Sequence, residues 1–489
     1  MNYLNCSIEQ LATQIKEIQD KSTPPQEVSR AIIGRCTGVQ KEFNVFISLG
    51  EDIISSELER LFRDRLPENG RLKLAGAIGV LGDNIATSRY LTTCASRMLQ
   101  SYRPPFDAGV VARLEDSGAV IAGKTNMDEF GVGCSGENSY FNSIKNPWNK
   151  KHTAGSGAAA AVLAGSAHFA LASDARGELR QAASYCGVIA LKPTYGRISR
   201  KGLLDYASSL ETIGIAARHI ADLAAVLGAV AGEDPDDVTT LQSAAPDYLS
   251  LLRENGGVRQ VAVPANWQDA PYLEEEMKDL FQEQLKKLEA LGVKIHFVEL
   301  PHLQYASLAA AIISAVEAFS NLSNYDGVRF GYRGEGKHLQ DMYAQTRSEG
   351  FSSRLKKFLT FGALVSTANY YQDYFLRAQK LRTVIAGELE ACLQEFDLLL
   401  TPTTPFQAPE LGAAEGGSGR SREELLDPAG YYTAAANLAG LPALTFPLQA
   451  AGLPYGLQLL SKKEDELTLL KAGLLLEKEN PLAWPDLAL

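Results

Sequence analysis

A strand–helix–strand pattern in residues 258–299 constrains the fold of this chain most strongly. Residues 261–263 (Val-Ala-Val) form a short apolar run, and residues 293–298 alternate in polarity as a half-buried strand does. Between these runs, the apolar residues of 273–291 fall on one helical face, and Gly292 follows as a helix terminator. Because parallel strands need such a crossover helix, the pattern predicts an α/β fold with a parallel or mixed sheet.

The same alternation continues along the rest of the chain. Ser7 and Gln10 form the capping box of a helix that we expect to run to about residue 20. The remaining patterns predict helices over about 25–40, 108–117 and 158–163, and strands over 119–122, 169–173 and 397–401.

The composition excludes several classes of protein. The formal net charge is −11 and no Lys/Arg run exceeds two residues, so we expect no direct nucleic-acid binding. No stretch offers the roughly 20 consecutive apolar residues of a membrane span, and the N-terminus does not resemble a signal peptide. The six cysteines form no CxxC pair and the six histidines no HxxxH or HxH pair. We therefore expect a soluble cytoplasmic protein with no metal site and no cofactor.

Three blocks of sequence carry a resemblance to a known family. They resemble the amidase signature family, and within it the A subunits of glutamyl-tRNA(Gln) amidotransferases. The blocks are residues 123–130 (GKTNMDEF) with 137–139 and 146–148, residues 172–214, and residues 437–442 (NLAGLP) with 454–458 (PYGLQ).

This resemblance implies one α/β domain over residues 1–489, with a mixed central β-sheet covered by helices on both faces. It divides into N-terminal helices at about 7–65, a signature core at about 72–230 and a C-terminal portion at about 258–489. Members of the family cleave amides with a Ser–cis-Ser–Lys triad. A neutral lysine takes the proton of the nucleophilic serine through the bridging serine, and backbone N–H groups before the nucleophile stabilise the oxyanion.

The resemblance places the three triad positions at residues that lack this chemistry. The family's lysine precedes an Asp-Asn-Ile triplet, and here Gly82 precedes that triplet. The bridging serine of the Gly/Ser-rich segment corresponds to Ala154. The nucleophile, 24 residues later, corresponds to Glu178. The catalytic triad is therefore degenerate in this sequence.

Several residues are candidates to replace the lost groups. Ser156 is interpreted as a turn residue, and Cys134 and Cys186 as buried thiols, since no base is evidently paired with either cysteine. Lys124 matches a family lysine outside the triad. A carboxylate at Glu178 could act as a general base on water.

The other interpretation is that Glu178 pairs with Arg176 or Arg180 in a remodelled pocket. Arg176 and Glu178 are larger than the glycine and serine that they replace, so this pocket should be narrower at its base.

The resemblance also implies a clamp for the α-amino and α-carboxylate groups of glutamine. By ungapped alignment, its arginine falls within residues 356–358, its aspartate at Gly430 and its tyrosine at Ala310 or Ala311. None of these positions carries the family's residue, so we expect the substrate clamp to be lost as well.

The sequence therefore predicts an amidase-signature chain that has lost amide hydrolysis: a non-catalytic subunit, a scaffold or a ligand-binding protein. The resemblance implies a protein partner subunit, and the remodelled cleft implies a small-molecule ligand. The alternative is an active amidase or glutaminase that uses displaced catalytic groups or new chemistry at Glu178.

Overall fold

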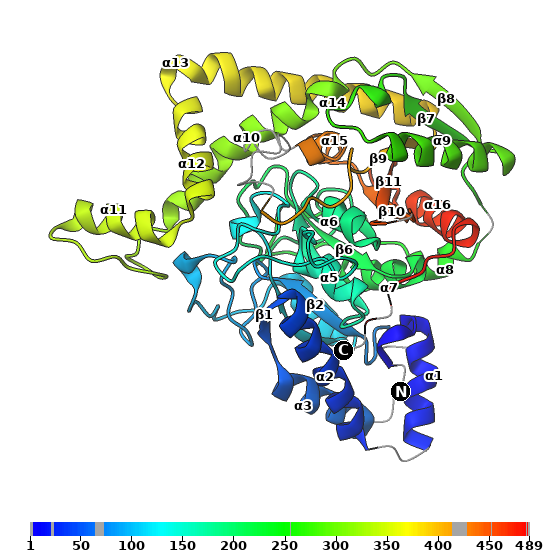
Figure 1. Cartoon of the computed structure of the whole chain (residues 1–489), viewed down its shortest axis with the longest axis horizontal. Coiled ribbons are helices and arrows are strands. Elements are labelled where there is room, and N and C mark those ends of the chain that lie inside the picture. The colour runs from blue at the N-terminus through cyan, green and yellow to red at the C-terminus, as the bar shows by residue number, and fades with distance from the viewer. Residues whose placement is uncertain are drawn as a thin grey trace.

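The computed structural model describes residues 3–20, 24–63, 73–254, 256–412, 428–450, 452–485 and 487 (Figure 1). Within these residues, eleven strands form one sheet in the order β1-β3-β2-β4-β6-β5-β10-β11-β9-β7-β8. The strands are β1 (Phe46–Leu49), β2 (Ile78–Gly82), β3 (Val120–Thr125), β4 (Phe169–Asp174), β5 (Ile189–Lys192), β6 (Thr212–Ala217), β7 (Gln260–Pro264), β8 (Lys294–Val298), β9 (Leu398–Pro402), β10 (Ala443–Leu448) and β11 (Tyr455–Leu460).

Helices flank this sheet along the whole chain. They are α1 (Ile8–Asp20), α2 (Pro25–Phe43), α3 (Glu51–Arg63), α4 (Gly109–Asp116), α5 (Gly157–Leu163), α6 (Glu178–Cys186), α7 (Ile220–Val230), α8 (Tyr248–Leu252), α9 (Glu275–Ala290), α10 (Ala306–Asn321), α11 (Leu339–Gly350), α12 (Ser353–Val365), α13 (Ala368–Tyr370), α14 (Leu376–Glu395), α15 (Ala434–Ala439) and α16 (Glu466–Glu479).

The sheet is mixed, as the sequence predicts. β2 pairs in parallel with β3 and β4, and β7 pairs in parallel with β8 and β9. The pairs at β1, β6, β10 and β11 are antiparallel. Every strand except β1, β7 and β8 is buried along its whole length. This burial explains why the sequences of the buried strands are mostly apolar.

The individual elements lie close to their predicted positions. The strand–helix–strand pattern of 258–299 is β7, α9 and β8, and the strands pair in parallel as that pattern requires. One half of the predicted capping box is present at α1, where the backbone N–H of Ser7 donates to Gln10 Oε1 at 3.1 Å. The backbone N–H of Gln10 donates to the carbonyl oxygen of Ser7 at 3.0 Å and not to its hydroxyl. The predicted N-terminal helices of 7–65 are α1 to α3, and the end of this range lies outside the described residues. That the whole chain is one domain stays a prediction.

Buried apolar side chains of the long helices near the top of Figure 1 form a cluster of their own. Ile313 of α10, Leu355 of α12 and Ile385 of α14 belong to it. The helical stretch Leu303–Asn324, which contains α10, is long and apolar enough to cross a membrane by length and composition, but 56% of its most apolar window is buried inside the protein. This burial gives the stretch an ordinary role as a core helix.

A buried ion pair fixes the loop that follows β2. The ammonium of Lys124, on β3, lies 3.8 Å from Asp83 Oδ1, and neither side chain is exposed. Lys124 Nζ also donates to the carbonyl oxygen of Ile85 at 2.7 Å and to Thr92 Oγ1 at 3.0 Å. Burial lowers the pKa of Lys124 and raises the pKa of Asp83, while their mutual attraction opposes both shifts. Lys124 therefore stabilises the loop, which accounts for its place in the sequence block.

We predict that Lys124→Met destabilises the fold by about 3–5 kcal/mol, because it leaves Asp83 buried without its counter-charge. The free energy of unfolding in urea measures this change. The matched control is Lys150→Met, which removes an exposed ion pair with Glu42 and should cost about 1 kcal/mol or less. Equal losses in the two variants would contradict the structural role of Lys124.

Candidate functional site

Two of the three positions that the resemblance aligns with the catalytic triad, Gly82 and Glu178, lie at one edge of the sheet. Gly82 ends β2 and Asp174 ends β4, and these neighbouring strands run in parallel, so their carboxyl ends lie at the same edge. Glu178 begins α6, directly after the turn that follows β4. Gly177 in this turn has φ of 113°, and a Cβ there would lie 2.1 Å from Thr433 Oγ1. Only glycine fits this sharp turn, which aims Glu178 back toward β4.

The carboxylate of Glu178 accepts several hydrogen bonds within this turn. Its Oε2 accepts the backbone N–H groups of Ala175 and Arg176 at 2.7 and 2.8 Å. Its Oε1 accepts the hydroxyl of Tyr206 at 2.8 Å and lies 3.7 Å from Arg176 Nε. Burial raises the pKa of Glu178, and the guanidinium of Arg176 opposes that rise. The side chain is 12% exposed, so Glu178 fills the pocket floor rather than facing open solvent.

The surroundings of Gly82 are closely packed. A Cβ on residue 82 would lie 3.2 Å from Asn84 Oδ1 and 3.4 Å from Ala172 Cα of β4. Asn84 is fully buried, and its Oδ1 has no hydrogen-bond partner among the described residues. Asn84 Oδ1 is therefore an unused acceptor beside residue 82, and a glycine has no side-chain donor to offer it.

Cys134 is the neighbour that links the segment of Ala154 to the backbone of Glu178. A Cβ on Gly155 would lie 2.6 Å from Cys134 Sγ. Cys134 Sγ in turn donates to the carbonyl oxygen of Glu178 at 3.2 Å. Ala154 itself is fully buried and offers only a methyl group. Cys134 thus lies between Gly155, the residue after Ala154, and the backbone of Glu178.

Arg180 has a different role from Arg176. Its Nε and Nη2 donate to the two carboxylate oxygens of Asp174, each at 2.9 Å. It also donates to Asn437 Oδ1 at 2.6 Å and to Gln458 Oε1 at 2.5 Å, and its side chain is fully buried. Burial alone would raise the pKa of Asp174, but Arg180 holds that pKa below its usual value. Arg180 therefore stabilises the turn by binding Asp174 at the end of β4. Arg176 is the arginine that pairs with Glu178.

The expected glutamine clamp positions also gather around Arg176. The guanidinium of Arg176 lies 5.6 Å from the ring centre of Phe358, the last residue of the 356–358 stretch. A Cβ on Gly430 would lie 3.7 Å from the carbonyl oxygen of Arg176 and 3.8 Å from Ser307 Oγ of α10. Ala310 and Ala311 are buried on the same helix. Of the expected clamp positions, Phe358 thus lies beside the guanidinium of Arg176, and Gly430 lies beside its backbone.

The sequence patterns do not point to two residues of the site, Tyr206 and Glu211. Tyr206 is fully buried and stacks edge-on against Phe358, with ring centres 6.4 Å apart. Glu211 is also fully buried and accepts the backbone N–H of Tyr206 at 3.0 Å. Burial raises the pKa of Glu211 well above its usual value, and nearby Asp205 adds to the rise. Their only sequence signal is that they flank the Ser208-Ser-Leu210 segment of the second block.

No buried lysine takes the place of the missing base among the described residues. Lys124 is held by the loop after β2, as described above. Burial lowers the pKa of Lys192 to about 7, yet its Nζ donates to the carbonyl oxygen of Pro193 at 2.8 Å. A lysine that loses its proton near neutral pH thus exists in Lys192, but its bond holds it away from the Glu178 carboxylate.

The other candidate replacements have structural partners. Ser156 caps α5, where its hydroxyl accepts the backbone N–H of Ala158 at 3.2 Å. Cys186 Sγ donates to the carbonyl oxygen of Ala154 at 3.5 Å, and burial raises the pKa of this thiol. In the part of the chain that the structure describes, no three His, Cys, Asp or Glu side chains are grouped to hold a metal ion.

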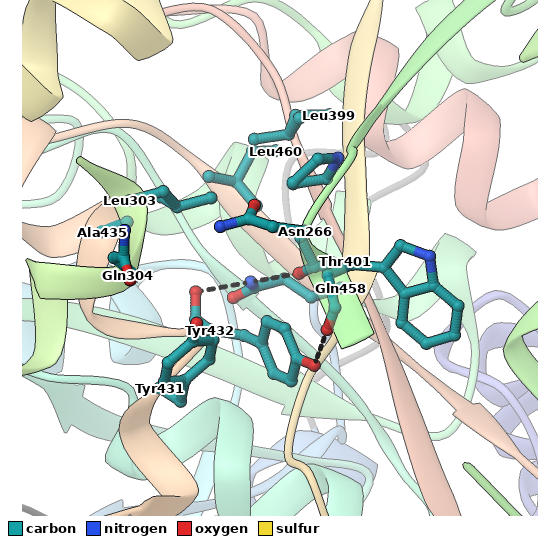
Figure 2. Close-up of a pocket in the computed structure, with 12 residues that line it drawn as sticks. Asn266, Leu303, Gln304, Leu399, Thr401, Tyr431, Tyr432, Ala435, Gln458 and Leu460 are labelled. Carbon is teal, nitrogen blue, oxygen red and sulfur yellow. Dashed lines mark hydrogen bonds between the residues drawn. The ribbon is translucent and has the colours of Figure 1, made fainter. Parts of the chain in front are cut away.

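Two hollows lie elsewhere in the molecule. Figure 2 shows the first, where Gln458 Nε2 donates to Thr401 Oγ1 and to the carbonyl oxygen of Tyr432, both at 3.0 Å. This pocket has room for about one water molecule. The second, a groove of about 680 Å³, is lined in part by Arg30, Arg218 and Trp484. Glu178 lines neither hollow.

Comparison with known proteins agrees with the resemblance read from the sequence. The model of the family described as Amidase matches residues 27–470. The chain is 40% identical over 467 residues to the A subunit of the glutamyl-tRNA(Gln) amidotransferase of Moorella thermoacetica, covering 94% of each chain. It is 37% identical over 490 residues to the corresponding protein of Lactobacillus gasseri, covering 98% of each chain.

Solved structures of similar proteins share the fold. The A subunit of the glutamyl-tRNA(Gln) amidotransferase of Thermotoga maritima superposes with a TM-score of 0.79 at 32% identity, covering 98% of this chain and 96% of that one. A 6-aminohexanoate cyclic dimer hydrolase superposes with a TM-score of 0.81 at 24% identity, covering 98% of each chain. The second likeness concerns the fold alone.

We predict that Glu211→Gln changes how stability depends on pH. A carboxyl whose pKa is raised on folding stabilises the folded state at low pH, and this contribution is lost as pH rises from about 4.5 toward the folded pKa. The glutamine of the variant does not ionise, so its free energy of unfolding is not reduced in this way as pH rises. Relative to the parent chain, the free energy of unfolding of the variant should therefore rise by up to about 1.4 kcal/mol per pH unit above about pH 5.

Urea unfolding at pH 5 to 8 measures this difference. Glu275→Gln, at a side chain that is 83% exposed, is the matched control and should show no trend. A parallel pH dependence of Glu211→Gln and the parent chain would contradict the raised pKa.

Proposed function

The chain belongs to the amidase family, and from this premise we propose that it is a subunit that does not hydrolyse amides. Its role would be that of a non-catalytic A-type subunit in an amidotransferase-like assembly in the cytoplasm. Relatives at 37–40% identity over 94–98% of this chain are named as amidotransferase subunits, which supports a protein partner. The remodelled cleft at Arg176 is the place for any small-molecule ligand.

The observation that carries this proposal is that the Glu178 carboxylate is already occupied by hydrogen bonds and an ion pair within the protein. A carboxylate accepts about four hydrogen bonds. Two backbone N–H groups, the hydroxyl of Tyr206 and the guanidinium of Arg176 approach these sites. A general base must instead present a free oxygen to the water that it activates. Glu178 is therefore poorly placed to act as one.

The surroundings of Glu178 support the same conclusion. Serine-based amide cleavage needs a hydroxyl nucleophile, a base within hydrogen-bond reach and donors for the oxyanion. Position 178 offers no hydroxyl, Ala154 cannot relay a proton and Gly82 has no amine. The N–H groups before residue 178, which would face an oxyanion in the family, already bind Glu178. Each requirement of the family's mechanism is thus unmet by the residue at its position.

The second candidate function is amide hydrolysis, by an amidase or glutaminase that uses Glu178 or displaced groups. Identity along nearly the whole chain to amidotransferase A subunits fits this candidate better than it fits a loss of hydrolysis. Its chemistry would require the Glu178 carboxylate to leave the two N–H groups and face a water molecule or the amide carbon. The raised pKa of Glu178 would suit a group that exchanges a proton near neutral pH.

Hydrolysis of glutamine, asparagine and an aryl amide tests the two candidates. We expect the wild-type chain, Glu178→Ala and the surface control Glu275→Ala to release ammonia or arylamine no faster than buffer. A triple variant with Gly82→Lys, Ala154→Ser and Glu178→Ser serves as a comparison in which the family's groups are restored. Turnover by the wild type that disappears in Glu178→Ala but persists in Glu275→Ala would overturn the proposal in favour of hydrolysis.

The proposed subunit role predicts a stable complex in the source organism. Native mass spectrometry of the gently purified protein should give a mass above that of the 52.9 kDa chain, with a different polypeptide in the complex. A lone chain or a homodimer would argue against the subunit role and would direct attention to small ligands at Arg176.

A further inference from the structure

A groove of about 680 Å³ lies between α2 and the last described residues of the chain. α2 is in the lower part of Figure 1, whereas α6, which begins at Glu178, is near the centre. The groove is therefore distinct from the site around Glu178, and its volume is in the range of small-molecule sites. Its walls are one face of α2, residues 3–5, Gly165 after α5, Arg218 after β6, and residues 484, 485 and 487.

A glycine on α2 keeps this groove open. Arg30 and Gly34 lie four residues apart in the helix, as do Ala31 and Arg35, so all four share one helical face. A Cβ on Gly34 would meet no atom within 4 Å. Glycine destabilises a helix interior relative to alanine, and at this position it leaves space between two arginines.

Positive charge gathers at the groove. Three of its lining residues are arginines, Arg30, Arg35 and Arg218, and no described lining residue is a carboxylate. Arg30 is exposed and forms no ion pair in the part of the chain that the structure describes. Burial and the like charge of Arg35 lower the pKa of Arg218 to about 10, so Arg218 still carries its proton at neutral pH.

Arg218 is held in place and has hydrogen-bond donors left over. Its guanidinium donates to the carbonyl oxygens of Val162 and Leu163 at 3.0 and 2.7 Å and to Asn5 Oδ1 at 2.9 Å. These bonds use three of its five N–H groups. The guanidinium also lies 5.0 Å from the ring centre of Trp484, whose buried Nε1 has no acceptor among the described residues. Unused donors beside a fixed positive charge are suited to an anion.

From these observations we infer that the groove binds a small organic phosphate, with its phosphate group on Arg218. The exposed Arg30 adds positive charge, and the apolar body of the ligand packs against Leu4 and Pro485. Several arginines at one groove suit the double negative charge of a phosphate monoester better than the single charge of a carboxylate. This inference goes beyond the proposed function, because the groove contains none of the residues around Glu178.

Isothermal titration calorimetry of the full-length chain with phenyl phosphate tests the inference. We expect saturable binding of about one molecule per chain, which weakens as the NaCl concentration rises. Inorganic phosphate lacks the apolar body and benzoate lacks the second charge, so both should bind more weakly than phenyl phosphate.

A blocking variant separates binding from charge and from folding. Gly34→Leu places a side chain in the groove while every arginine stays, and leucine favours a helix more than glycine does. It should weaken the binding of phenyl phosphate about tenfold or more. The matched control is Gly387→Leu on α14, where a Cβ would also meet no atom within 4 Å, and it should bind as the wild type does.

A charge variant and a resonance locate the bound phosphate. Arg218→Gln removes the charged donor and should weaken binding about tenfold or more. If Arg218→Gln does not fold, because Arg218 also holds the end of α5, Gly34→Leu decides the question. With ¹⁵N-labelled tryptophan, the indole resonance of Trp484, assigned with Trp484→Phe, should move on titration with phenyl phosphate.

Three results would overturn the inference. The first is an absence of saturable binding by the wild type. The second is equal affinity for phenyl phosphate and benzoate, which would contradict the choice of a phosphate. The third is binding that Gly34→Leu leaves unchanged, with a Trp484 resonance that does not move, since the ligand would then lie outside the groove.

Discussion

The ion pair between Asp174 and Arg180 holds together the part of the molecule on which the candidate site depends. Two hydrogen bonds of 2.9 Å join the end of β4 to α6, and further bonds from Arg180 reach Asn437 and Gln458 in the C-terminal part of the chain. Because both charges are fully buried, their mutual pairing and their hydrogen bonds must compensate the cost of desolvation. This network fixes the turn between β4 and α6 irrespective of what stands at residue 178.

The turn between β4 and α6 has the N–H groups that the family uses to stabilise an oxyanion. Its N–H groups still converge on one point, and Glu178 now supplies the negative charge that they would stabilise. Arg176 balances that charge and packs against Phe358, in the stretch where the family places a clamp arginine. In the described structure, Glu178, its two N–H donors, Arg176 and Phe358 thus form one contiguous cluster. Fold and site vary independently in such a case.

The sequence was sufficient for the fold, because local patterns of apolar strands and amphipathic helices carry it. The family resemblance aligned Gly82, Ala154 and Glu178 with the triad, and the parallel strands β2 and β4 bring two of these positions to one edge. The direction of the Glu178 side chain could not be predicted, since it depends on the backbone of Gly177 and on Tyr206 in a distant loop. Two partners of Arg180, Asn437 and Gln458, lie more than 250 residues away, so local sequence could not separate its role from that of Arg176.

The proposed loss of amide hydrolysis rests on Glu178 closing the oxyanion-type site of the wild type. A crystal structure of the wild type grown with saturating glutamine tests this closure most directly. We predict that the Glu178 carboxylate remains on the N–H groups of Ala175 and Arg176, with no carbonyl oxygen or water in its place. A glutamine carboxamide oxygen on those N–H groups, with Glu178 turned away toward a water molecule, would contradict the closure.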